Sequence, residues 1–87
     1  MSTKKQIKPK WFHGVWYDKG EEVTNPFSGE CYTLTGPELS IYDFIMGSQY
    51  VMEVAHKSVT KKQIDDFHKA ISWFRKHNGR AYMVLLD

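Results

Sequence analysis

The chain has 87 residues, of which 41% are hydrophobic and 15% aromatic, and this composition excludes an intrinsically disordered protein. A chain of this length forms one domain that buries only about 60–65% of its unfolded surface, so a partner or a second copy would add usefully to its stability. The net charge is +2, and a single cysteine excludes an internal disulfide, so we expect a cytoplasmic protein. No long apolar run is present, so we expect the protein to be soluble and without a membrane segment.

The first residues differ in composition from the rest of the chain. Residues 1–9, "MSTKKQIKP", are polar and basic and end in a proline, which predicts a mobile tail. Residues 10–87 then form a single domain. Its first segment, "KWFHGVWYD", is aromatic enough to predict a strand, and "EEVTN" predicts the returning strand of a hairpin. Between them "DKG" is a turn, in which Gly20 is available for a positive φ.

The next turn, "NPFSGE", places a large apolar residue between two predicted strands. Pro26 fixes φ, Gly29 suits a left-handed position, and Asn25 and Ser28 have side chains that bond to nearby backbone. We expect this turn to fold Phe27 back over the edge of the sheet as a buried plug. The tripeptide Asn-Pro-Phe is also a short ligand motif for a eukaryotic endocytic domain, an interpretation that requires Phe27 to be exposed.

Two helices follow a third short strand at "CYTLT". Thr35 and Glu38 form the pattern T-x-x-E of a capping box, which predicts a helix over residues 36–56. Thr60 and Gln63 repeat the pattern at the start of a second helix, and the sequence "HNG" is typical of its end.

The chain closes with "AYMVLL", whose continuous apolar character predicts a fourth strand. The resulting order is β-β-β-α-α-β. It predicts the α+β fold class, with a small, mostly antiparallel sheet covered by two α-helices.

Residues with the chemistry for metal binding or catalysis do not form a recognisable motif. The four histidines and the cysteine lack the H-x₃₋₅-H and C-x₂-C spacings of metal ligands, so we expect no metal and no cofactor. Asp65 and Asp66 lie in the first turns of the second helix, four residues from Lys69 and Lys62, as ordinary helix ion pairs do. No nucleophile motif or phosphate loop is present, so we expect no enzyme.

Nucleic-acid binding is the alternative function that the sequence leaves open. Lysines next to aromatic residues are the components of a surface for single strands. The residues in question are Lys4, Lys5, Lys8, Lys10, Trp11 and Phe12. The second helix adds Lys62, Lys69 and Lys76, which are spaced seven residues apart and share one face with Trp73. Asp65 and Asp66 in the same helix reduce the positive charge of that face.

The first helix has more apolar surface than one sheet face buries. One stripe consists of Ile41, Phe44, Ile45, Met52 and Ala55. A roughly opposite stripe consists of Leu39, Tyr42, Met46 and Tyr50. We expect this second stripe to be partly exposed and to bind a protein partner, because Tyr and Met are enriched at interfaces. The alternative is that the second helix covers one stripe while the aromatic hairpin covers the far face of the sheet. The second helix would use Ile64, Phe67, Ile71 and Phe74.

Three stretches of the chain, "VTNPFSGE", "LTGPELSIYDFIMG" and "WFRKHNGRAYMVLLD", resemble small uncharacterised proteins encoded by tailed phages of marine bacteria. The resemblance covers residues 11–87 and implies a setting in an infected host cytoplasm or a virion. Small non-enzymatic proteins in that setting commonly bind and redirect host proteins. We therefore expect a non-catalytic interaction module that binds itself, a virion component or a host protein.

Overall fold

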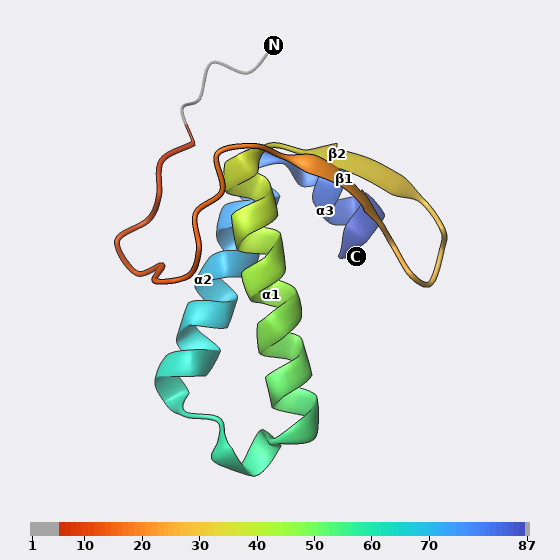
Figure 1. Cartoon of the computed structure of the whole chain (residues 1–87). Helices are drawn as coiled ribbons and strands as arrows, with labels where there is room; N and C mark the ends of the chain where they lie inside the picture. The colour runs from red at the N-terminus through yellow and green to blue at the C-terminus, as the bar shows by residue number, and fades with distance from the viewer. Residues whose placement is uncertain (1–5, 87) are drawn as a thin grey trace.

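The computed structural model describes residues 6–86 and shows an α+β fold, which confirms the predicted class (Figure 1). Two strands form one antiparallel hairpin, and three α-helices and a 3₁₀ turn follow it. The elements are β1 (Glu21–Thr24), β2 (Cys31–Leu34), α1 (Gly36–Val54), η1 (His56–Ser58), α2 (Lys61–His77) and α3 (Gly79–Leu85). The predicted sheet order is wrong, because the first and last predicted strands are a loop and a helix.

The segment from Lys10 to Asp18, predicted as a strand, is irregular. The backbone N–H of Phe12 donates to the carbonyl of Pro9 at 3.1 Å, which closes a turn and leaves no ladder for a neighbouring strand. Phe12 is only 2% exposed, and its ring packs edge-on against Trp16 at a centroid distance of 5.6 Å. The aromatic residues of this segment therefore fix a loop on the helices instead of forming a sheet.

The hairpin that forms joins the second and third predicted strands through the predicted turn "NPFSGE", without the predicted plug, and the hairpin predicted around Gly20 is wrong. Asn25 Oδ1 accepts hydrogen bonds from the N–H groups of Phe27 and Ser28, at 2.8 and 3.2 Å, and Gly29 has the expected left-handed φ of 80°. Phe27 itself is 96% exposed. The loop between β1 and β2 points away from the α1–α2 pair (Figure 1). Among the described residues the sheet has two strands, so it offers no third strand against which the ring would pack.

Both predicted capping boxes are present. Thr35 accepts from the N–H of Glu38 at the start of α1, and Glu38 in turn accepts from the N–H of Thr35. Thr60 and Gln63 make the same reciprocal pair at the start of α2. Sequence and structure agree here because the cap is a local motif that needs only four residues.

The closing apolar run is α3 and not a strand. The side chain of Asn78 accepts from the N–H of Ala81 at 3.1 Å, so the residue that ends α2 also caps α3. Ala81 and Leu85 are buried four residues apart, whereas Met83 between them is exposed, which is helical spacing. A short, continuously apolar run fits a buried strand and a buried helix equally well, and that ambiguity caused the wrong prediction.

Residues 1–5 of the predicted tail lie outside the described residues, so a mobile tail over residues 1–9 stays a prediction. Gln6 is hydrogen-bonded to the α1 capping box: its Nε2 donates to Glu38 Oε2 at 2.8 Å, and its Oε1 accepts from Thr35 Oγ1 at 2.7 Å. No helix within residues 6–86 is long and apolar enough to cross a membrane.

Candidate binding site

The predicted contact stripe on α1 divides into a buried half and an exposed half. Leu39 and Tyr42 belong to the core, at 8% and 7% exposure, so the expectation that they form a free surface is wrong. The N-terminal half of α1 is enclosed by neighbouring elements, and the Tyr42 ring lies 6.3 Å from that of Phe74 on α2. Burial also raises the pKa of the Tyr42 hydroxyl. Met46 is half-buried, and Tyr50 is 66% exposed.

A cavity of about 370 Å³ opens between α1 and α2, at the end of the helix pair nearest η1. Its walls are mainly apolar. The lining residues are Phe44, Gly47, Ser48, Val51, Met52, Val59, Gln63 and Asp66. Val51 in this lining is exposed, and so is Val54, which lies three residues later on the same side of α1. The exposed apolar surface of α1 therefore lies in its C-terminal half, where Tyr50 is the exposed member of the predicted stripe.

The cavity exists because the N-terminal loop fills only part of the surface between the helices. The rings of Trp11 and Phe12 lie 6.2 and 5.6 Å from that of Phe44, which also lines the cavity. Figure 1 shows this loop beside the upper part of the helix pair, while the lower part, near η1, extends beyond it. Phe44 thus has the chain's own aromatic rings on one side and the open cavity on the other.

Gly47 widens the cavity at the middle of α1. A Cβ atom built at this position meets nothing within 4 Å, so packing of the described residues does not require a glycine. Glycine in a helix interior is about 1 kcal/mol less favourable than alanine. The sequence therefore accepts a helical penalty at a position whose missing side chain leaves the cavity open.

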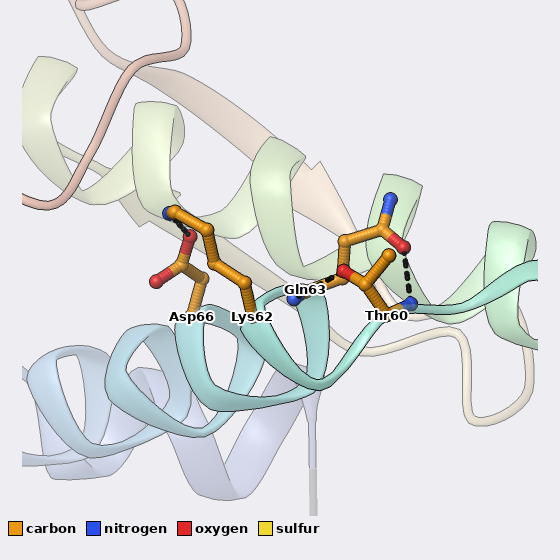
Figure 2. Close-up of polar contacts among 4 residues, drawn as sticks. All are labelled: Thr60, Lys62, Gln63 and Asp66. Carbon is orange, nitrogen blue, oxygen red and sulfur yellow. Dashed lines mark hydrogen bonds and ion pairs between the residues drawn. The ribbon is translucent and has the colours of Figure 1, made fainter.

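Polar groups at the rim are held by bonds within α2 and its cap (Figure 2). Gln63 Oε1 accepts from the N–H of Thr60 at 2.8 Å, and Lys62 Nζ lies 2.8 Å from Asp66 Oδ2. The Lys62 hydrogen bond is the main cause that holds the pKa of the Asp66 carboxyl below its usual value. Asp66 is accordingly ionised at neutral pH, and the rim offers fixed hydrogen-bond acceptors around an apolar floor.

A second, shallower depression of about 400 Å³ combines aromatic and basic side chains on the outer side of α2. Its lining residues are Trp11, His68, Lys69, Ser72, Trp73, Lys76 and His77. The Trp73 and His77 rings are stacked, with centroids 4.1 Å apart and planes at 18°. His77 Nδ1 also lies 2.9 Å from the Trp73 carbonyl oxygen, which fixes the imidazole in place.

The residues predicted for nucleic-acid binding meet only in part. Trp11 lies beside the lysines of α2, and Lys8 and Lys10 are exposed nearby in the sequence. Phe12 is buried, so the expectation that it stacks on a base is wrong. Lys4 and Lys5 lie outside the described residues. Lys62 is the first of the three α2 lysines spaced seven residues apart. It is paired with Asp66, which lines the α1–α2 cavity and not this depression.

Within residues 6–86, no three His, Cys, Asp or Glu side chains are close enough together to hold a metal ion. Comparisons with protein-family models, curated proteins and solved structures gave no match to this chain. The two surfaces described above are therefore the candidate functional sites of the described residues. The cavity was not predicted from the sequence, where Gly47 in the middle of a predicted helix is its signal.

Proposed function

We propose that the protein is a non-catalytic protein-interaction module whose binding site is the cavity between α1 and α2. The observation that carries this proposal is an apolar cavity whose lining includes the exposed side chain of Val51, with Val54 also exposed three residues further along α1. Contiguous exposed apolar surface on a small protein marks an interaction site, because leaving it in water is unfavourable. The polar rim groups are engaged in bonds within the protein, which suits binding rather than proton transfer.

The chain itself indicates the chemistry of the ligand. Phe12 and Trp11 pack against Phe44 from above with inclined or edge-on rings, at 77° and 56° to the Phe44 plane. Aromatic pairs of this kind contribute about 0.5–1.5 kcal/mol beyond the burial of their area. We infer that the cavity accepts an aromatic or large aliphatic side chain from a protein segment, in contact with the free side of Phe44.

Three kinds of protein partner fit this role: a second copy of the chain, a virion component, or a host protein. The resemblance of three short stretches to small tailed-phage proteins supports a setting in an infected bacterial cytoplasm or a virion. In that setting a small domain acts by occupying a surface on another protein.

Selection of peptides from a random display library on the folded protein tests the proposal. Gly47→Leu fills the cavity mouth with a residue that also favours the helix, and Gly47→Ala is the matched control that changes helix propensity with little added volume. We expect selected peptides to carry an aromatic or large aliphatic anchor and to bind Gly47→Leu about tenfold more weakly or worse. Peptides that bind wild type and Gly47→Leu equally would refute this site.

The basic and aromatic depression on α2 favours a second candidate function, the binding of single-stranded nucleic acid. Trp11 and the Trp73–His77 stack offer flat rings for bases, and Lys69 and Lys76 are exposed beside them. Base stacking on aromatic rings contributes about 1–3 kcal/mol per base, and lysines supply phosphate contacts.

Salt-dependent binding of a fluorescent oligothymidylate tests this second function. Each phosphate contact adds about 0.7 to the slope of log affinity against log salt for a single strand. The double variant Lys69→Ala, Lys76→Ala should therefore lower the slope by about 1.4. Lys57→Ala, Lys61→Ala removes the same charge from η1 and the first residue of α2, and it should leave the slope unchanged. Equal slopes for both double variants would exclude the depression as the binding surface.

A further inference from the structure

We propose that the occupant of the α1–α2 cavity is Phe27 from a second copy of this chain. The inference rests on the proposed function, and it names the partner. Phe27 is 96% exposed at the tip of the hairpin, and the cavity is open at the far end of the helix pair. Each chain therefore carries an unburied aromatic side chain and an apolar cavity whose wall includes an aromatic ring.

The turn presents Phe27 on a fixed backbone. Asn25 Oδ1 accepts from the N–H groups of Phe27 and Ser28, and the backbone N–H of Gly29 donates to the Asn25 carbonyl at 2.9 Å. Asn25 Nδ2 also donates to the Val84 carbonyl on α3, which ties the turn to the helices. A side chain held on an ordered turn loses little conformational freedom on binding, and this reduces the entropic cost of association.

The size of the cavity suits one aromatic anchor. At about 370 Å³ it lies near the lower end of the range of about 300–1,000 Å³ for ligand pockets. Val51, Met52 and Val59 supply aliphatic walls, and Phe44 supplies a ring face or edge. A buried Phe removes about 150–250 Å² of surface from water, which makes this side chain a typical interface anchor.

Charge complementarity favours the same pairing. Residues 21–30, which present Phe27, contain Glu21, Glu22 and Glu30 and no basic residue. Residues 56–62, which contribute Val59 to the cavity wall, contain three lysines and no acidic residue. Docking of the turn into the cavity brings these two segments together, so opposite charges surround the apolar contact. Lys62 is paired with Asp66, which lines the cavity, and Glu53 and Asp65 flank the basic segment, so the attraction for the acidic turn depends on Lys57 and Lys61.

Sedimentation velocity of the full chain over a rising concentration series tests the proposal. We expect wild type to associate reversibly, and we expect Phe27→Ala to weaken the association about thirtyfold or more, as truncation of an interface anchor does. Met83→Ala is the control, because it removes an exposed apolar side chain from α3 instead. Gly47→Leu closes the cavity, and Val51→Glu places a charge in its wall. Each of these variants should weaken association as strongly as Phe27→Ala.

Mixing variants provides the decisive measurement. Phe27→Ala retains an intact cavity, and Gly47→Leu retains an intact Phe27, so an equimolar mixture should associate although neither variant does so alone. A charge exchange adds a second arm: Glu30→Lys should weaken association, and a partner carrying Lys61→Glu should partly restore it.

A wild-type chain that stays monomeric at millimolar concentration overturns the proposal, as does Phe27→Ala association equal to wild type. Circular dichroism of each variant confirms folding, and Val51→Glu replaces Gly47→Leu if that variant does not fold. Failure here is separate from failure of the proposed function. Selected peptides that still discriminate Gly47→Leu from wild type would show a working cavity whose partner is a different protein.

Discussion

The side-chain amide of Asn25 donates a hydrogen bond of 2.9 Å to the backbone carbonyl oxygen of Val84, which lies 59 residues later in the chain. This bond joins the tip of the β1–β2 hairpin to α3. The same side chain accepts two N–H bonds inside the turn, and Asn25 is nearly buried. A single polar residue thus determines the shape of the turn and attaches it to the body of the domain.

Replacing Asn25 with Ala should lower the free energy of unfolding by about 1–3 kcal/mol, the cost of leaving buried partners of a polar group unsatisfied. Urea denaturation followed by circular dichroism measures the change. Thr33→Ala on the exposed part of β2 serves as a control for hairpin substitutions and should change stability by less than about 0.5 kcal/mol. A similar small loss for Asn25→Ala would show that the link to α3 contributes nothing.

Two phenylalanines should respond oppositely to truncation in stability measurements. Phe12 is buried against Trp16 and Phe44, so Phe12→Ala should cost about 3–5 kcal/mol. Phe27 makes no such contacts, and Phe27→Ala should stay within about 0.5 kcal/mol of wild type. Thermal unfolding at low protein concentration, where association does not contribute, gives both values. A large loss for Phe27→Ala at that dilution would indicate that its ring packs against its own chain.

Replacement by alanine should have opposite effects on protein stability at two of the glycines. A Cβ at Gly20 would lie 1.6 Å from the backbone oxygen of Leu34, a clash with a strand that does not move without breaking the hairpin, so Gly20→Ala should be strongly destabilising. At Gly47 the same atom meets nothing, and Gly47→Ala should stabilise the protein by up to about 1 kcal/mol. Melting temperatures of the two variants test this contrast, and a stable Gly20→Ala variant would contradict the described approach of loop and strand.

Stability should depend on pH in the alkaline range through Tyr17. Its hydroxyl donates to Asp43 Oδ2 at 2.9 Å, and this hydrogen bond is the main reason why the pKa of Tyr17 is raised above 10.0. A raised pKa means that the folded state favours the protonated phenol. The resulting stabilisation is complete below pH 10 and is lost as the pH rises through the folded-state pKa.

Unfolding free energies of wild type and Tyr17→Phe, measured from pH 8 to pH 12, isolate this contribution. Wild type should be the more stable protein at pH 8, and the difference should shrink above pH 10. Tyr42 has a raised pKa as well, because of burial, but it is present in both proteins and cancels in the comparison. A difference that is constant across the range would argue against the Tyr17–Asp43 bond.

The features predicted correctly from the sequence are those encoded within a few residues. Thr35 with Glu38, and Thr60 with Gln63, form caps whose geometry depends on local backbone alone. The left-handed Gly29 is similar, because only a residue without Cβ adopts that φ freely. These elements needed no knowledge of the tertiary fold.

The errors concern residues whose environment comes from distant parts of the chain. Ala81 to Leu86 are apolar on every side, and the choice between helix and strand was made by Asn78, whose ability to cap α3 after ending α2 was missed. Leu39 and Tyr42 were expected at the surface because one sheet face was expected to bury only one of the two stripes. Both α2 and β2 contact α1, and the Tyr42 ring lies 6.3 Å from that of Phe74 on α2, so the N-terminal half of α1 is enclosed.

The packing of the N-terminal loop on α1 and α2 has a consequence for biosynthesis. Trp16 is made 57 residues before Trp73, although the two rings lie 6.4 Å apart between their centroids in the folded protein. At about 5–20 residues per second, the Trp16 ring is exposed for several seconds on every nascent chain. We therefore expect the unfinished polypeptide to be a substrate for ribosome-associated chaperones, and ribosome profiling of chaperone-bound chains should show occupancy that begins once Phe12 and Trp16 have left the ribosome.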